Sequence, residues 1–168
     1  MSQLGMLGVA APRAVFSNCG RYRYSLWREW RKDARLRCLF VMLNPSTADS
    51  EQDDPTIRRC IGYAKLWGYD ALDVANLYAF RSTDPKALWT VEDPVGPRND
   101  ESILDLAAGA DRIVVAWGNN AKRERENDVL NLLHGYEVLA LGITGEGAPA
   151  HPLYQRADVE PRPYWRGA

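Results

Sequence analysis

Four short apolar runs alternate with helical patterns along most of this chain, and that alternation is what most constrains its fold. The runs have the length of strands and are rich in aliphatic residues; they are residues 38–43, 71–75, 112–116 and 136–141. Apolar residues at helical spacing lie between them, over 55–67, 99–108 and 119–133. Strands that alternate with helices form parallel sheets with helices on both faces. The sequence therefore predicts an α/β fold, a three-layer α/β/α sandwich with a central four-stranded, mainly parallel sheet.

The segments outside this alternation fall at the margins of the predicted fold. Residues 21–30 alternate in part between apolar and polar side chains, which predicts an N-terminal antiparallel edge strand or hairpin. Residues 157–168 are rich in proline and are expected to form an extended C-terminal tail. A chain of 168 residues is long enough for one domain with a substantial core and short for two. We therefore expect a single domain over residues 1–168.

Composition argues against several classes of protein. The three cysteines, Cys19, Cys38 and Cys60, are odd in number and widely spaced, which indicates neither a disulfide framework nor a zinc knuckle. We accordingly expect no metal and no other cofactor. No apolar run approaches the roughly 18 residues of a membrane span, and the amino terminus lacks the basic segment of a secretory signal. The expected location is cytoplasmic, with no membrane partner.

The charge of the chain leaves two interpretations of its partners. A formal net charge of -1 is unlike the basic excess of a dedicated duplex-DNA binder. Basic residues nevertheless crowd residues 21–37, and a second basic group lies at 122–125. Such groups are either solvated surface or contacts to phosphates, and both interpretations stay open.

Polar and aromatic residues follow the predicted strands at their carboxyl ends. The carboxyl ends of parallel strands share one rim of a sheet, and ligands of open α/β folds bind at that rim. We therefore expect these residues to meet around one cleft. In strand order they are Asn44, Pro45, Ser46 and Thr47, then Asn76, Tyr78 and Phe80, then Trp117 and Gly118, and finally a glycine-rich segment that leads to His151.

Each of these residues also has a structural explanation. An asparagine at the end of a strand holds turns through its side chain, which applies to Asn44 and Asn76. Aromatic residues such as Tyr78 more often pack in a core than stack on a ligand. A single histidine in a proline-flanked loop, such as His151, is more often structural than catalytic. Both interpretations stay open for each residue.

Six segments of the chain resemble one known family. They are LFVMLNPSTAD, DPTIRRCIGYAKLWGY, NLYAFRSTDP, DPVGPRND, VVAWGNNA and GAPAHPLYQ. Together they are similar to the domain-of-unknown-function 1643 family of bacterial and phage proteins, over residues 14–154. The resemblance implies no established activity.

The same motifs, in the same order, are more remotely similar to the uracil-DNA glycosylase superfamily. That resemblance implies a uracil-DNA glycosylase-like sandwich in which Asn44, before Pro45, orients the attacking water. It further implies that Asn76 reads an extruded base and that His151, before Pro152, acts on the departing base. Leu153 stands where the superfamily has a serine.

Cleavage of an N-glycosidic bond defines what such a site must supply. Negative charge develops on the departing base, so a donor such as His151 is needed at a base oxygen. Asn44 would orient water, aided by Asp49 or Asp53. Asn76 offers both a donor and an acceptor to the Watson–Crick edge. The other base- or ligand-binding candidates are Pro45, Ser46, Thr47, Tyr78, Phe80, Trp117 and Gly118.

Three functions therefore follow as hypotheses. The first is an N-glycosylase that acts on a modified or mismatched base in DNA. The second is an enzyme or sensor that binds a free nucleotide, nucleoside or related metabolite in the same cleft. The third is a non-enzymatic nucleic-acid-binding module. The expected partner is accordingly DNA or a nucleotide-like small molecule.

Overall fold

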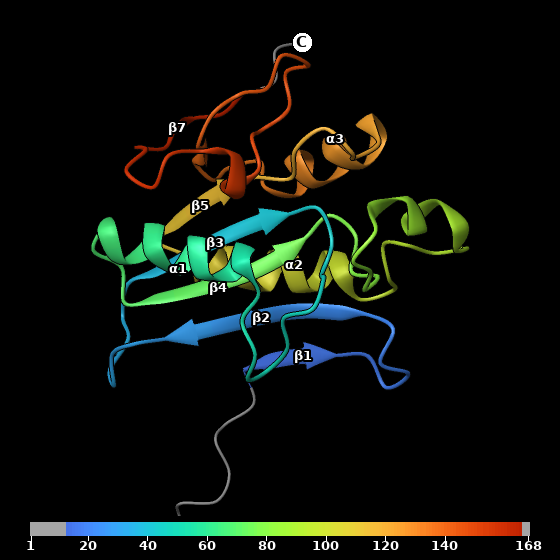
Figure 1. Ribbon diagram of the computed structural model, residues 1–168, viewed down its shortest axis with the longest axis horizontal. Coiled ribbons are helices and arrows are strands. Elements are labelled where there is room, and N and C mark those ends of the chain that lie inside the picture. Colours follow the sequence, from blue (N-terminus) through green and yellow to red (C-terminus); the bar gives the residue numbers. More distant parts are fainter. Residues whose placement is uncertain (1–12, 166–168) are drawn as a thin grey trace, which may run out of the picture.

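The computed structural model describes residues 13–165 of the chain, and the predicted features at 1–12 and 166–168 lie outside the described residues. Figure 1 shows the strands as one twisted sheet with helices packed against it. The elements in chain order are β1 (Ala14–Phe16), β2 (Arg23–Glu29), β3 (Arg37–Met42), α1 (Pro55–Leu66), β4 (Ala71–Asn76), η2 (Pro85–Thr90), α2 (Asn99–Ala108), β5 (Arg112–Val115), α3 (Arg123–Leu132), β6 (Val138–Ala140), η3 (Pro152–Tyr154) and β7 (Arg162–Pro163).

The predicted α/β class is confirmed, but the sheet is larger than predicted. Within residues 13–165 the sheet has seven strands, in the order β1-β2-β4-β3-β5-β6-β7. The four inner strands β4, β3, β5 and β6 are parallel, as the alternation of strands and helices predicts. The segment predicted as an antiparallel edge strand or hairpin, residues 21–30, forms β2, which pairs antiparallel with β4. Strand β1, which the sequence did not predict, pairs with β2 and forms the edge.

The tail, which the sequence predicts to be extended, contains the short edge strand β7, which the sequence did not predict. Strand β7 pairs antiparallel with β6, with Leu139 opposite Pro163 and Ala140 opposite Arg162. Proline is tolerated there because an edge strand does not need every N–H. The hydroxyl of Tyr164, a buried residue, donates to the carbonyl of Gly147 at 3.0 Å. The tail therefore holds the glycine-rich loop that precedes His151.

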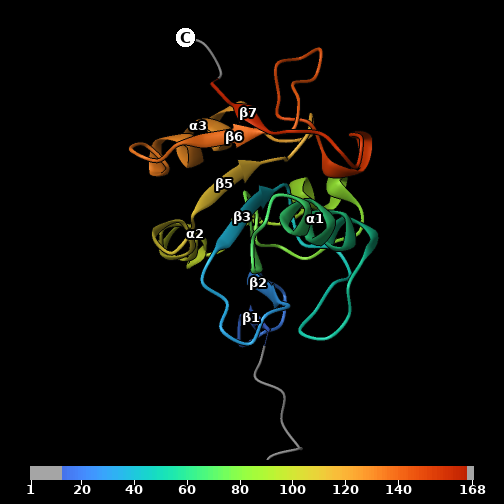
Figure 2. The same cartoon turned by 90° about the vertical axis from the view of Figure 1, so that its left-hand side faces the viewer.

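Helices cover both faces of the sheet, and Figure 2 shows α1 on one side with α2 and α3 on the other. Alternate residues of β3 face the two sides, so Phe40 packs with α1 and Val41 packs with α2 and α3. Both residues are fully buried. Burial of such a side chain stabilises the fold by about 1.5–3 kcal/mol. This two-sided burial explains why the inner strands read as continuous apolar runs.

Helix α1 begins where its sequence predicts. The side chain of Asp54 accepts a hydrogen bond from the backbone N–H of Ile57 at 2.9 Å, and Pro55 occupies the first helical position. The helix ends before Gly68, whose φ of 87° is a left-handed conformation that glycine adopts without strain. These two signals fix where α1 begins and ends, and its amino end lies at the cavity on the carboxyl rim of the sheet.

The parallel register brings the carboxyl ends of the inner strands together. Met42 of β3 lies opposite Asn76 of β4, and Val41 lies opposite Val115 of β5. Val115 in turn lies opposite Ala140 of β6. The loops that follow these four strands therefore start from one rim. Within residues 13–165, no helix combines the length and the apolar character that crossing a bilayer requires.

Candidate functional site

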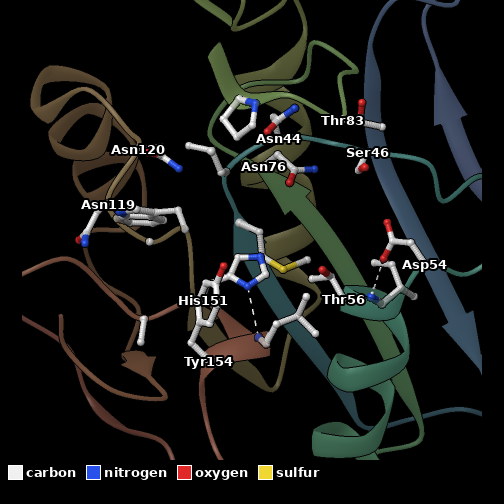
Figure 3. Close-up of a pocket in the computed structure, with 18 of the residues that line it drawn as sticks. Asn44, Ser46, Asp54, Thr56, Asn76, Thr83, Asn119, Asn120, His151 and Tyr154 are labelled. Carbon is white, nitrogen blue, oxygen red and sulfur yellow. Dashed lines mark hydrogen bonds between the residues drawn. The ribbon is translucent and has the colours of Figure 1, made fainter. Parts of the chain in front are cut away.

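A cavity of about 630 Å³ opens at the carboxyl rim of the sheet. Segments that follow all four inner strands line it, together with the amino end of α1 (Figure 3). Cavities that bind small molecules usually fall between about 300 and 1,000 Å³. Of the predicted site residues, the structure brings Asn44, Ser46, Asn76, Trp117, Gly118 and His151 to this cavity.

Asn76, the last residue of β4, has an unusual environment. Its side chain lines the cavity and the residue is only 2% exposed, yet neither Nδ2 nor Oδ1 has a hydrogen-bond partner among the described residues. A buried polar group without a partner costs the folded protein free energy, and such groups are rare in native structures. A donor and an acceptor without partners among the described residues therefore lie at one fixed position in the wall of the cavity.

Two residues hold the backbone on either side of this amide. The side-chain Nδ2 of Asn99 donates to the carbonyls of Asn76 and Leu77, at 2.9 and 3.0 Å. Arg125 Nε donates to the Leu77 carbonyl at 2.7 Å, and Arg125 also pairs with Asp100. The sequence indicates Asn99 only as part of a helix start, and nothing near Arg125 signals this contact.

Asn44 has a structural role at one end of its side chain and a free group at the other. Its Nδ2 donates to the carbonyl of Ser82 at 2.9 Å and makes longer contacts to those of Pro45 and Phe80. These bonds join two loops of the rim and fix the orientation of the amide. Oδ1 has no partner within the described part of the chain, and the side chain lines the cavity. Asn44 can therefore both hold a turn and accept a hydrogen bond from a molecule in the cavity.

His151 presents one defined tautomer. Its Nδ1 accepts a hydrogen bond from the backbone N–H of Leu153 at 3.2 Å, which caps η3. Burial lowers the pKa of His151 below its ordinary 6.5, and the charge of Asp54 opposes part of that shift. The ring is therefore neutral at pH 7, and because Nδ1 is an acceptor, Nε2 carries the proton. The side chain lines the cavity with that N–H as its free donor.

The lowered pKa of His151 predicts how stability depends on pH. The unfolded chain takes up this proton at a higher pH than the folded protein does, so the free energy of unfolding falls as pH drops below about 6.5. We expect wild type to lose more stability than His151→Asn between about pH 7.5 and about pH 5.5, measured by urea denaturation. Asparagine keeps an acceptor for Leu153 N–H.

The other histidine of the chain provides the matched control for this measurement. His134→Asn also removes one histidine and is measured alongside, because His134 lies near the end of α3 and is not among the described residues that line the cavity. Equal losses of stability in wild type and His151→Asn would contradict the assignment.

The two predicted catalytic carboxylates do not line the cavity in the described structure. Asp49 Oδ1 accepts from the backbone N–H groups of Gln52 and Glu51, at 2.7 and 2.8 Å, which lowers the pKa of Asp49. Asp53 forms an ion pair with Arg28 at 2.7 Å. Both therefore shape the loop after β3. Asp54 is the only carboxylate among the described lining residues, and the sequence assigned it only the cap of α1.

Several predicted ligand contacts are structural in this fold. Tyr78 is buried in the core, where its hydroxyl accepts from Lys122 N–H at 3.1 Å and its ring packs edge-on against Trp89. Phe80 pairs with Tyr22 beside the hairpin. Pro45 and Thr47 are also not among the described lining residues. The aromatic side chains that do line the cavity are Trp117, whose Nε1 donates to Glu126 at 2.8 Å, and Tyr154, which is 84% exposed.

Arg23 lines the cavity, and the sequence did not single it out. It lies at the start of β2 and is 2% exposed. Nη1 donates to the Ala48 carbonyl at 2.8 Å, but Nε has no partner, and no carboxylate within residues 13–165 forms an ion pair with it. Burial lowers the pKa of Arg23 to about 10, so it remains charged at neutral pH. Its only signal in the sequence was membership of the basic group at 21–37.

Comparison with known proteins gives one match. The family model described as "Protein of unknown function (DUF1643)" matches residues 23–153, which include the described cavity-lining residues except Tyr154 and Gln155. No curated protein and no solved structure matches the chain.

Proposed function

The chain belongs to the family described as "Protein of unknown function (DUF1643)", a description that states no activity, and we propose from the cavity itself that the protein is an N-glycosylase. Its substrate would be a modified or mismatched base in DNA. The observation that carries the proposal is the buried amide of Asn76. Its Nδ2 and Oδ1 have no hydrogen-bond partner within residues 13–165, and the side chain lines the same cavity as the neutral ring of His151.

The amide of Asn76 suits the edge of a nucleobase. A lactam edge presents an N–H beside a carbonyl, and a carboxamide offers the complementary acceptor and donor from one planar group. Because the described part of the chain supplies Asn76 with neither bond, a ligand that supplies them removes a cost already present. A site of this kind also rejects a ligand that lacks the matching groups, since the amide would then stay unpaired.

His151 and Asn76 serve different parts of the base in this proposal. As the N-glycosidic bond breaks, its electron pair passes to the base, and negative charge develops on the carbonyl oxygen. A neutral imidazole with its proton on Nε2 donates to that oxygen without a prior protonation step. Both side chains line one cavity, and the proposal places one base against both.

Asn44 and Asp54 act on the water that attacks the sugar. Asn44 Oδ1 accepts a hydrogen bond from the attacking water and orients it, while its Nδ2 stays fixed by backbone carbonyls. The water oxygen adds to the anomeric carbon, and the carboxylate of Asp54 takes the released proton. That negative charge also stabilises the positive charge that develops on the sugar. The base leaves as an anion and takes up a proton from solvent, and Asp54 returns its proton to solvent. The products are the free base and a sugar with a hydroxyl at the anomeric carbon.

Two features support the DNA form of the substrate. The order of motifs and the helices on both faces of the sheet support a relation to the uracil-DNA glycosylase superfamily, with its three-layer sandwich. Leu153 and Tyr154 line the cavity and are exposed, which suits side chains that occupy the space left by an extruded base.

A second candidate is an enzyme or sensor for a free nucleotide or nucleoside. The cavity volume of about 630 Å³ falls within the range of small-molecule sites, and the formal net charge is -1. Both observations favour a small ligand at least as well as a duplex. The roles of Asn76 and His151 are the same for either source of the base.

The experiment that tests the proposal separates the two sources. Oligonucleotides that carry a panel of modified or mismatched bases are incubated with the protein, and abasic sites are detected by alkaline strand cleavage. Nucleosides and nucleotides of the same bases are tested in parallel, with the released base measured by chromatography. Release from oligonucleotides alone supports a DNA glycosylase, and release from free nucleotides alone supports the second candidate. Release from neither, across the panel, contradicts N-glycosylase activity.

Asn44→Ala tests the water-orienting role within the same assay. We expect base release to fall by about 10²-fold or more, as for loss of a positioned group in proton transfer. Asn120→Ala is the matched control, because Asn120 lines the cavity as an exposed residue with no assigned role. Thermal unfolding checks that both variants are folded at the assay temperature. Full turnover by folded Asn44→Ala would remove Asn44 from the mechanism.

A further inference from the structure

The buried arginines of this fold differ in one respect. Arg28 pairs with Asp53 and Arg125 pairs with Asp100, each at 2.7 Å. Arg23 is equally buried and has no carboxylate partner in the described structure. A buried cation without a counter-ion is costly, so its partner is expected to come from outside the chain. Because Arg23 lines the cavity, that partner would be an anionic group of the ligand.

Three segments distant in sequence form the wall around Arg23. Arg23 N–H donates to the Ala79 carbonyl at 2.9 Å, and its guanidinium binds the Ala48 carbonyl. Ser82 N–H donates to the Pro45 carbonyl at 2.9 Å. The starts of β2 and of the loops after β3 and β4 are thus joined by backbone hydrogen bonds. This bonding fixes the wall before a ligand binds.

Hydroxyl groups of that wall are available as donors. Ser46 and Thr83 line the cavity on the same side, near Asn44 (Figure 3). Neither hydroxyl has a hydrogen-bond partner within residues 13–165. Phosphate oxygens accept readily from hydroxyl groups and from guanidinium groups together.

More positive charge lies just beyond these hydroxyls. A shallow hollow of about 390 Å³ is lined by Arg21 and Arg81, and it shares Ser46, Ser82 and Thr83 with the cavity. Arg81 is close enough that its positive charge contributes to the lowered pKa of Arg23. Two acids act against this cluster, Asp54 in the cavity wall and Asp49, whose carboxylate is bound by backbone N–H groups. Arg28 also acts on Arg23 but pairs with Asp53, which leaves the guanidinium groups of Arg21, Arg23 and Arg81 against the carboxylates of Asp49 and Asp54.

We propose that the wall formed by Arg23, Ser46 and Thr83, with Arg81 beyond it, binds the phosphate of a nucleotide whose base contacts Asn76. The inference rests on the proposed function, because it takes the ligand to be nucleoside-like. It adds that the ligand is phosphorylated. That phosphate belongs either to a free nucleotide or to a nucleic-acid strand, and the contacts are the same for both.

Binding measurements test the phosphate site without any need for catalysis. Inorganic phosphate, a panel of nucleosides and the corresponding 5′-monophosphates are titrated against the whole chain by calorimetry at constant ionic strength. We expect wild type to bind a monophosphate about tenfold or more tightly than its nucleoside, as for charged hydrogen bonds, and inorganic phosphate to compete. A panel without such a preference, and no binding of inorganic phosphate, would overturn the site.

Substitutions assign the preference to Arg23. In Arg23→Met, the affinity for a monophosphate should be close to the affinity for its nucleoside. Arg23→Lys should keep part of the preference for the monophosphate because a charge remains. Arg31→Met is the matched control, since Arg31 is exposed and pairs with Asp70 away from the cavity. If Arg23→Met does not fold, Arg23→Lys and Arg81→Met decide, and an unchanged preference for the monophosphate in both would overturn the proposal.

A single-stranded oligonucleotide distinguishes the two sources of the phosphate. If the strand supplies it, the salt dependence of strand binding should fall by about one phosphate contact in Arg23→Met. If a free nucleotide supplies it, only monophosphate binding should change. If nucleosides are cleaved and a phosphate group raises neither their affinity nor their rate of cleavage, the phosphate site is overturned and the proposed function stands. Phosphate-dependent binding with no base released from any substrate would support the site and contradict the N-glycosylase.

Discussion

Replacement of Asn76 by leucine is expected to stabilise the folded protein by about 1–3 kcal/mol and to abolish ligand binding. The two side chains have similar shapes, but leucine buries no donor or acceptor. The present amide is 2% exposed and has no partner at either polar atom in the described structure. Its removal therefore relieves a desolvation cost, and at the same time it removes the groups that would contact a base.

Chemical denaturation and ligand titration measure the two parts of this expectation on the same variant. Asn99→Leu is the matched control, because Asn99 is also fully buried but donates to two backbone carbonyls. That variant should be less stable than wild type, since the carbonyls of Asn76 and Leu77 would each lose a donor. If Asn76→Leu lowers stability and binding persists, the amide is a structural group, and the central observation of the proposed function fails.

Replacement of His151 by alanine is expected to lower the rate of base release by about 10²–10³-fold, as for loss of one donor to a developing negative charge. Alanine also removes the acceptor for Leu153 N–H, so it changes the turn as well as the chemistry. His151→Asn separates these effects, because asparagine caps the turn but lacks the reach of Nε2.

Single-turnover rates of the two His151 variants decide between the roles. Similar losses in His151→Ala and His151→Asn support donation from Nε2, whereas near-normal rates in His151→Asn would show that only the turn matters. His134→Ala is the control, and its rate should equal that of wild type. Circular dichroism on each variant verifies that the fold is retained.

The sequence predicts well the strands and helices that position this site, because these elements depend on local patterns. The apolar runs coincide with β3, β4, β5 and β6, and the predicted helices 55–67 and 99–108 correspond closely to α1 and α2. Helix α3 begins later than predicted, at Arg123, because residues 119–122 form the loop where Lys122 N–H donates to Tyr78. Once the strands are parallel, the ends that carry Asn44, Asn76 and Trp117 must share a rim.

What the sequence leaves undecided depends on contacts between distant segments. Asp49, Asp53 and Asp54 are near neighbours in one loop, and a pattern cannot choose among them. Arg28, from another strand, forms an ion pair with Asp53, and backbone N–H groups of the loop donate to Asp49. Of the three carboxylates, Asp54 is the one that lines the cavity. Tyr78 and Phe80 likewise lie beyond the strand end, but the chain turns there and directs them into the core and the hairpin.

Arg23 and β7 were missed for a related reason. Both lie at the ends of the chain, where local composition indicated a basic surface and an extended tail. Arg23 is buried because its strand pairs beside β4, and the loop after β3 closes over its side chain. Strand β7 forms because the edge of β6 is open to it. Neither pairing leaves a signal in a single short segment.

The contact of Tyr164 with Gly147 has a practical consequence for anyone who shortens this protein. The matched family region ends at residue 153, and a fragment trimmed to that limit would lose β7 and the hydroxyl that restrains the glycine loop. Such a fragment would expose the β6 edge to other chains in the test tube and so invite aggregation. Expression designs should therefore retain the polypeptide through Tyr164 and place any purification tag beyond it.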